Sequence, residues 1–218
     1  MRRQGWRGAV SPTPRTTPQS IDQEFEARTA TAEDAGRLST ALAEAFLEDP
    51  IFSWLMPNRA SRPARLRRFF SIELRHLVLE RGEAFTTGEL TGVALSLPPG
   101  TWSTPPWVAL LQGGCFGMRL HRPAGLLALI EWRHPRKPHY YFPYIGVAPP
   151  AQGQGLGSSL MRPTLDRCDE QGLPAYLEAS SERNAVLYER LGFELTSELR
   201  FAGSPPLRLM MRAPRPLH

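Results

Sequence analysis

The chain has 218 residues, of which 41% are apolar and 22% are charged, a balance typical of a globular protein rather than a disordered one. No apolar run approaches the roughly 20 residues that a membrane-spanning helix needs, so a transmembrane protein is not expected. The net charge of +5 is concentrated at one end: residues 1–20 hold four arginines and no acid, which leaves +1 for the remainder. Nucleic acid is therefore not the expected partner.

Residues 1–22 are predicted to form a disordered basic arm, because Pro12, Pro14 and Pro18 lie among serines and threonines that cannot build a packed face. No apolar core follows the N-terminal arginines, so the arm does not resemble a signal peptide. Cys115 and Cys168 lie far apart and without metal-ligand spacing, so neither a disulfide nor a metal site is expected. A reduced cytoplasm is the expected location.

The predicted elements of the first half follow from residue periodicity and from proline and glycine positions. Pro50 is expected to end the first helix, which opens at Thr31. The expected elements are a strand at 24–29, a helix from 31 to about 49, a helix at 60–81, a hairpin of strands 84–87 and 93–97, and a loop at 98–106.

The second half is predicted to start with helical or irregular segments at 107–118 and 123–133, and then to alternate between strands and helices. The expected elements are a strand at 140–147, a turn at 153–157, a helix at 156–171, a strand at 175–179, a helix at 184–191, and strands at 193–201 and 207–212. The order β-α-α-β-β-(helical insert)-β-α-β-α-β-β predicts an α/β protein with a mixed sheet around one core. We expect one domain over residues 23–213, with an insert at about 99–138 and a tail at 214–218.

Three glycines, Gly153, Gly155 and Gly157, separate a predicted strand from a predicted helix. Glycines in such a turn allow successive N–H groups to point into one concavity at a helix N-terminus, where an anion such as a phosphate binds. A flexible connection is the alternative. A Walker loop would need a lysine here, and a dinucleotide fingerprint would need glycine at 158, where this chain has serine, although Glu178 lies at a suitable distance for its acidic residue.

The segment Gln152-Gly-Gln-Gly-Leu-Gly157 has the form of an acyl-CoA loop and resembles the GCN5-related N-acetyltransferases, the GNAT superfamily. The segment Asn184-Ala-Val-Leu-Tyr-Glu-Arg-Leu-Gly-Phe193 is similar to the last helix of that family. More narrowly, residues 139–213 resemble puromycin N-acetyltransferase and its relatives. The resemblance implies the GNAT acyl-CoA N-acyltransferase fold, a three-layer α/β/α arrangement.

The resemblance also implies how acetyl-CoA binds. The pantetheine arm would pair with the exposed backbone of Ile145, Gly146 and Val147, and an N–H near Val147 would polarise the thioester carbonyl. Asn184 would contact pantetheine, although a helix N-cap is an alternative role for it. Main-chain amides would hold the diphosphate, and these belong to Gln152, Gly153, Gln154, Gly155, Leu156, Gly157 and Ser158.

Two catalytic residues are implied. Tyr188 matches the general acid that protonates the departing thiolate, and it would also lie against the cofactor. Glu178, at the end of a strand beside the loop, is our choice of general base, directly or through water; an ion-pair partner of an arginine is the alternative. Glu48 and Asp49 are rival bases. The histidines at 121, 134 and 139 are expected to be structural, and Cys168 is expected to be buried rather than nucleophilic, which favours a ternary complex.

The expected function is transfer of an acetyl group from acetyl-CoA to a primary amine of a small molecule by direct attack. A protein or peptide acceptor is less favoured, and a non-catalytic module that binds acyl-CoA or a partner is the main alternative. Pairing of terminal strands between two chains would give a homodimer. The acceptor pocket would be walled by aromatic residues, unless these pack in the core: Phe52, Trp54, Trp132, Tyr140 and Tyr141.

Overall fold

The computed structural model describes residues 26–216. The predicted basic arm at 1–22 and the start of the predicted first strand lie outside the described residues. Within residues 26–216, none of the helices combines the length and the apolarity that crossing a membrane requires.

The first sheet is antiparallel and takes three of its four strands from the N-terminal half of the chain. Its strands are β1 (Arg28–Thr29), β2 (Glu83–Thr86), β3 (Gly92–Ser96) and β5 (Ile145–Val147), in the order β1-β2-β3-β5. The register of β2 and β3 pairs Phe85 with Ala94, so the predicted hairpin is confirmed. β5 pairs with β3 on one side only and is the edge strand of this sheet.

The C-terminal half builds the second sheet. Its strands are β4 (Tyr140–Phe142), β6 (Ala175–Ala179), β8 (Leu207–Arg212) and β7 (Glu194–Leu199), in the order β4-β6-β8-β7. β4 and β6 run parallel, and the remaining pairs are antiparallel. The predicted terminal strand pair is confirmed.

The segment at 140–147 is where the two sheets meet and separate. It was predicted as one strand, but Pro143 and Tyr144 interrupt it, and its two halves belong to different sheets. Leu97 and Tyr141 still exchange backbone hydrogen bonds of 2.8 and 2.9 Å. β4 pairs with β6 only as far as Leu177, and beyond that point β5 follows β3. The expectation of a single sheet around one core is therefore wrong. Two sheets diverge here, and one apolar cluster lies on each face of them.

Alternating side chains place these two clusters on opposite faces. Val93 and Leu95 of β3 pack against the N-terminal helices, whereas Ala94 between them belongs to the cluster beneath the helix at 156–171. In β6, Tyr176 and Leu177 divide in the same way. Because successive strand residues point to opposite faces, helices cover the sheets on both sides, which is the predicted layered α/β arrangement.

The N-terminal helices are α1 (Ala35–Ala45), α2 (Pro50–Leu55) and α3 (Arg62–Glu73), the last continued by a π-helical turn at Leu74–Val78 and by α4 (Leu79–Arg81). Helix α2 is not predicted from the sequence, because Pro50 is assigned there only to the end of the preceding helix. Proline also suits the first position of a helix, and here Asp49 caps α2, accepting hydrogen bonds of 2.9 and 3.0 Å from the N–H groups of Ile51 and Phe52.

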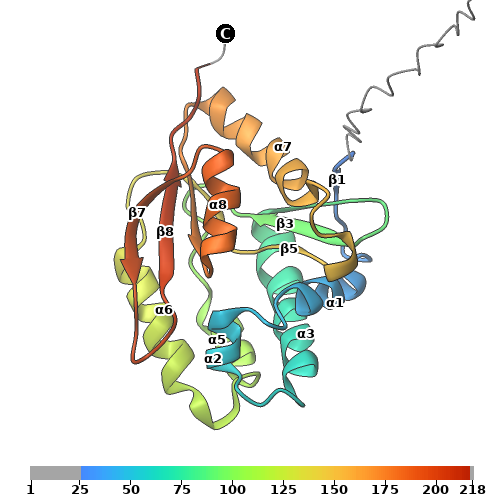
Figure 1. Ribbon diagram of the computed structural model, residues 1–218, viewed down its shortest axis with the longest axis vertical. Helices are drawn as coiled ribbons and strands as arrows, with labels where there is room; N and C mark the ends of the chain where they lie inside the picture. The colour runs from blue at the N-terminus through green and yellow to red at the C-terminus, as the bar shows by residue number, and fades with distance from the viewer. Residues whose placement is uncertain (1–25, 217–218) are drawn as a thin grey trace, which may run out of the picture.

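The insert forms α5 (Pro106–Gly113), a 3-10 turn at Gly117–Arg119 and α6 (His121–Arg133). Pro123 lies within the first turn of α6 and does not interrupt it. α7 (Leu156–Gln171) has the predicted bounds, and α8 (Glu182–Arg190) starts two residues earlier than predicted because Ser181 is its N-cap. Figure 1 shows α7 on one side of β3 and β5, with α1 and α3 on the other side, while α8 packs against β6 of the second sheet.

Candidate active site

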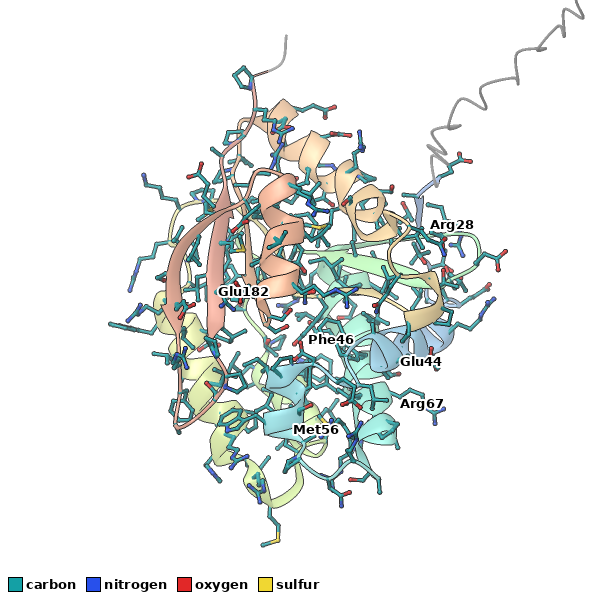
Figure 2. All side chains as sticks on the ribbon, in the orientation of Figure 1. Arg28, Glu44, Phe46, Met56, Arg67 and Glu182 are labelled. Atoms are coloured by element: carbon teal, nitrogen blue, oxygen red, sulfur yellow. The ribbon has the colours of Figure 1, made fainter. Side chains whose placement is uncertain are left out.

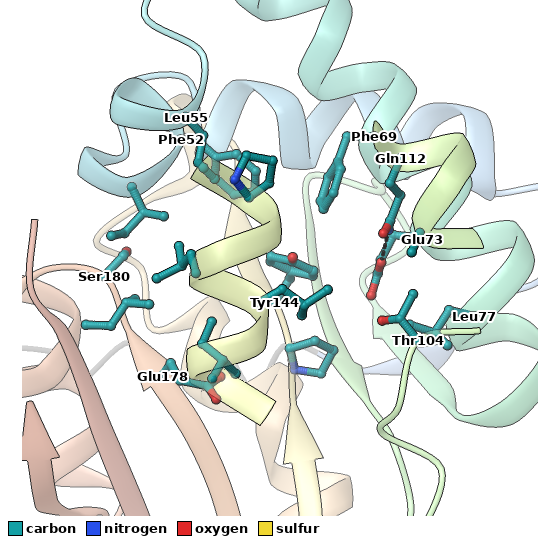
Figure 3. Close-up of a pocket in the computed structure, with 18 of the residues that line it drawn as sticks. Phe52, Leu55, Phe69, Glu73, Leu77, Thr104, Gln112, Tyr144, Glu178 and Ser180 are labelled. Carbon is teal, nitrogen blue, oxygen red and sulfur yellow. Dashed lines mark hydrogen bonds between the residues drawn. The ribbon is translucent and has the colours of Figure 1, made fainter. Parts of the chain in front are cut away.

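A cavity of about 830 Å³ lies where the two sheets diverge. Its wall comes from the α1–α2 junction, α3, the insert helices α5 and α6, the β4–β5 connection, the end of β6 and α8. Phe46, one of its lining residues, lies near the centre of the molecule in Figure 2. The close-up in Figure 3 shows how the polar side chains are distributed around Tyr144.

Glu178 lines this cavity from β6, just beyond the point where β4 stops pairing. Its Oε2 accepts a 2.8 Å hydrogen bond from the hydroxyl group of Tyr141, and its Oε1 is buried without a partner among the described residues. Burial raises the pKa of Glu178 to about 7, although the hydroxyl groups of Tyr141 and Tyr176 oppose that shift. Its partner is thus a tyrosine, and the alternative of an ion pair with arginine is not supported.

Asp49 reaches the same cavity, and Glu48 does not. The carboxyl group of Asp49 caps α2 through one oxygen and receives a hydrogen bond from the hydroxyl group of Ser180 on the other. Burial raises the pKa of Asp49, and the bonds from Ser180 and the α2 backbone oppose this shift. Glu48 instead forms an exposed ion pair with Arg59 at 2.5 Å. Of the two rival bases, the structure therefore places only Asp49 at the site.

α8 brings Asn184 and Tyr188 to the cavity wall, one turn apart on the same face. The N-cap of α8 is Ser181, whose hydroxyl oxygen accepts a 3.2 Å bond from the N–H of Asn184, so the alternative N-cap role for Asn184 is wrong. Burial first, and the negative charge of Asp49 second, raise the pKa of Tyr188 above its ordinary value. The phenol therefore stays protonated at neutral pH.

The sequence prediction missed Glu73, the last residue of α3. Its side chain is 4% exposed and lines the cavity, and Oε2 accepts a 2.6 Å bond from the side-chain amide of Gln112 on α5. Burial raises the pKa of Glu73 to about 7. One signal was available: Glu73 lies three and four residues after Phe70 and Phe69, on the apolar face of the predicted helix, where an acid is out of place.

The aromatic wall was predicted only in part. Phe52 and Tyr141 line the cavity, as expected. The other three lie elsewhere: Tyr140 donates to Gln171, Trp132 is 67% exposed, and Trp54 is covered by the guanidinium of Arg122. Six further aromatic residues line the cavity but were not predicted as part of its wall: Phe46, Phe69, Trp102, Phe116, Phe142 and Tyr144.

The glycine loop has the backbone that its sequence predicts. Gly153 and Gly155 have φ values of +80° and +81°, and Gly155 is the N-cap of α7. A Cβ atom at either position would meet nothing within 4 Å, so their conformation rather than crowding calls for glycine. The side-chain amide of Gln152 donates a 2.9 Å bond to the carbonyl oxygen of Val147, which ties the loop to β5.

β5 connects this loop to the cavity. Its Ile145 lines the cavity, and the strand's second edge has no partner strand among the described residues. Gly146 is required by packing, because a Cβ atom there would lie 2.8 Å from Cδ2 of Leu42 on α1. The structure thus brings together the predicted edge Ile145–Val147, Glu178, Asn184 and Tyr188, while their predicted roles in binding and catalysis stay predictions.

The histidines and cysteines occupy other roles. His134 lines the cavity, stacks on Trp102 at 3.8 Å and lies 2.9 Å, Nε2 to Nε2, from His139. Cys168 is fully buried, and burial raises the pKa of its thiol to about 12, so it is not poised as a nucleophile. Within the described part of the chain, no group of three or more metal-ligating side chains is assembled.

Comparisons with known proteins agree with this geometry. The profile of the Acetyltransferase (GNAT) family matches residues 41–193. An uncharacterized N-acetyltransferase of Schizosaccharomyces pombe is 26% identical over 208 residues, which cover 86% of this chain and 83% of that protein. A structure described as histone acetyltransferase HPA2 and related acetyltransferase, from Corynebacterium glutamicum, superposes with a TM-score of 0.67 at 27% identity, covering 87% of this chain and 96% of the other. Arylalkylamine N-acetyltransferase 2 from Aedes aegypti shares the fold, with a TM-score of 0.59 at 12% identity over 87% of this chain and 99% of that one.

Proposed function

Because this chain belongs to the GNAT family of acetyltransferases, we propose that it transfers the acetyl group of acetyl-CoA to a primary amine of a small molecule. Family membership supports acetyl-CoA-dependent N-acetyl transfer, and the choice of acceptor is our own. The observation that carries this choice is the cavity in which Glu178, Asp49 and Tyr188 line one wall. The narrower resemblance to puromycin N-acetyltransferase stays a prediction.

The cofactor would bind across the gap between the sheets. The unpaired edge of β5 offers backbone groups of Ile145–Val147 to the pantetheine arm, and the amides from Gln152 to Ser158 surround the N-terminus of α7, where an anion is favoured. Asn184 would reach the same arm from α8. In this arrangement the thioester meets the cavity beside Ile145.

The residues of the cavity supply what the chemistry requires. Glu178 accepts a proton from the ammonium group of the acceptor through its unpartnered Oε1, directly or through water, which frees the amine lone pair. The nitrogen then forms a bond to the acetyl carbon, and the carbon–sulfur bond breaks. Tyr188 gives its proton to the departing sulfur, and the second proton that the new amide nitrogen releases returns to the tyrosinate, directly or through water.

Direct attack is supported over an acetylated enzyme. Cys168 lies on the buried face of α7, and its thiol has a raised pKa, so no thiolate is presented to the thioester. Cys115 is buried as well, and burial raises its pKa too. We therefore expect both substrates to be bound together before chemistry begins.

A small acceptor is favoured by the form of the site. The cavity has the volume of a ligand site, within the range of about 300–1,000 Å³, and insert residues Leu110, Leu120 and Leu127 lie on its wall. A protein lysine would have to enter past these insert residues. The peptide acceptor is for this reason the second candidate.

The test is release of free CoA thiol by the full chain with acetyl-CoA and a panel of amines, with products confirmed by mass spectrometry. Catalysis with small amines, and loss of it in Glu178→Gln, are expected. Acetylation of peptides alone would overturn the small-molecule acceptor. Binding of CoA in calorimetry without transfer to any amine or peptide would indicate the non-catalytic module, and heat with NAD or ATP but not with CoA would overturn the whole proposal.

A further inference from the structure

The charges on the cavity wall are unbalanced. Among the described residues that line it are four carboxyl groups, those of Asp49, Glu73, Glu178 and the exposed Glu131 near the end of α6, together with His134, whose pKa burial lowers to about 3, but no arginine or lysine. Elsewhere in the molecule, partly buried carboxylates are matched by the chain itself: Asp169 pairs with Arg212, and Glu83 pairs with Arg167. The cavity therefore holds acids that the chain does not neutralise.

Glu73 is a buried acid of this wall that has no part in the proposed reaction. Its carboxyl group is almost fully buried, and the hydrogen bond it receives comes from the neutral amide of Gln112. A carboxylate can accept about four hydrogen bonds, and burying one with a single neutral donor is unfavourable unless it takes up a proton, as the raised pKa of Glu73 favours, or a cation joins it. Glu73 also ends α3 at the start of the π-helical turn Leu74–Val78, a distortion that occurs frequently at functional sites.

The two ends of the cavity are separated. In Figure 3, Glu178 and Ser180 lie on one side of Tyr144, and Glu73 with Gln112 lies on the other. Between them the wall is mostly apolar and aromatic, with Phe69 close to Gln112 in the same view. Two cationic groups joined by an apolar spacer therefore match this wall better than a single ammonium group does.

We propose that the acceptor carries a second basic nitrogen, which binds as a cation at Glu73 while its primary amine meets Glu178. This inference rests on the proposed function and adds the substrate class: a small molecule with two basic nitrogens and an apolar body. Glu73 then determines specificity, and Gln112 holds its carboxyl group in position. A purely structural Glu73–Gln112 bond between α3 and α5 is the competing explanation.

The test compares α,ω-diamines with n-alkylamines of the same carbon number as acceptors, with the full chain and acetyl-CoA. The wild type should prefer the diamine at one best spacer length, with kcat/KM at least about tenfold higher than for the matched monoamine. Glu73→Gln should remove this preference by lowering kcat/KM for the diamine. Glu44→Gln is the matched control, because Glu44 is an exposed acid on α1, and this variant should keep the preference.

A second variant separates recognition from structure and serves if Glu73→Gln does not fold. Glu73→Asp keeps the charge but withdraws it by one methylene, so the best diamine should become longer; a structural bond predicts no such change. The inference is overturned if the wild type shows no preference for diamines at any length, or if the preference survives Glu73→Gln. Acetylation of monoamines without that preference would leave the proposed function standing, whereas no acetylation of any amine would overturn both.

Discussion

The hydroxyl group of Tyr141 donates a 2.8 Å hydrogen bond to Glu178, across the level at which β4 and β6 stop pairing. Burial favours the neutral form of this carboxyl group, whereas the bond from Tyr141, with a further contribution from the hydroxyl group of Tyr176, favours the ionised form; the pKa of Glu178 is left at about 7. A base with a pKa near the working pH combines a useful ionised fraction with enough basicity to accept a proton. Tyr141 is therefore a positioning and tuning residue for Glu178.

Tyr141→Phe should move the acidic limb of the pH profile. Removing the donor withdraws a contact that stabilises the carboxylate, so the pKa of Glu178 should rise by about one unit, and the limb of kcat/KM should shift to higher pH by the same amount. Tyr140→Phe is the matched control, because the hydroxyl group of Tyr140 donates to Gln171, away from the cavity. A limb that stays in place in Tyr141→Phe, or that persists in Glu178→Gln, would exclude Glu178 as the base.

Asp49→Asn should leave the acidic limb in place. Both oxygens of Asp49 already accept hydrogen bonds, one from the α2 backbone and one from Ser180, whereas Glu178 has a free oxygen. Asparagine is as good an N-cap as aspartate, so the free energy of unfolding should change by no more than about 1 kcal/mol. The measurements are the kcat/KM profile and urea denaturation; loss of the limb in a folded variant would make Asp49 the base.

Tyr188→Phe should lower kcat at least about tenfold, because the thiolate would leave without a proton. The affinity for acetyl-CoA should change little, since only one hydroxyl group is removed, and calorimetry measures it. Because the pKa of Tyr188 is raised, its ionisation should place no basic limb near neutral pH in the wild type. Unchanged turnover at saturating substrates would remove Tyr188 from the mechanism.

The sequence predicted best where local signals agree with the tertiary structure. α7 and β6 have the predicted bounds because a glycine turn, a helical apolar face and a run of strand formers follow one another without conflict. Residues 140–147 were predicted as one strand because aromatic and β-branched residues continue through it. Its division depends on which neighbour each half pairs with, β6 or β3, and a single strand's sequence does not encode its partners.

In the candidate site, too, the residues with local sequence signals could be predicted, and those that depend on tertiary contacts could not. Asn184, Tyr188 and the glycine loop follow each other closely in the sequence, so a motif could identify them. Glu73 and Gln112 are 39 residues apart, and only folding brings them together. Nothing local distinguishes Asp49 from Glu48: the choice between these neighbours depends on Asp49 capping α2 while Glu48 points to Arg59.

Gly155→Ala should raise the Kd for acetyl-CoA as well as lower the stability of the fold. Alanine at a left-handed φ of +81° costs about 1–2 kcal/mol, and relieving that strain would reorient the amides at the start of α7. Gly172→Ala is the matched control at the other end of the same helix, where φ is +64° and no atom lies near the missing Cβ. Both variants should lose similar stability in thermal unfolding, and only Gly155→Ala should raise the Kd for CoA. An equal Kd in both would contradict a cofactor role for the loop.

Asp169→Asn should destabilise the fold without touching the cavity. Asp169, near the end of α7, accepts bonds of 2.8 and 2.7 Å from the guanidinium of Arg212 on β8, a side chain that is 3% exposed. Its loss leaves that charge buried without its partner, which should cost about 3 kcal/mol of unfolding free energy at neutral pH. Asp166→Asn, an exposed acid on the same helix, is the control and should be nearly neutral.

The same pair predicts how stability depends on pH. The bonds from Arg212 hold the pKa of Asp169 below its ordinary value of 3.8, so its contribution is fully present above that value. It is lost as the pH falls through the lowered pKa of the folded state. The free energy of unfolding of Asp169→Asn should therefore fall less steeply in acid than that of the wild type, because the variant has no such proton to bind. Denaturation curves at a series of acidic pH values give the slope of unfolding free energy against pH for the wild type and for Asp169→Asn. Equal slopes in the two proteins would show that Arg212 does not stabilise the ionised form of Asp169.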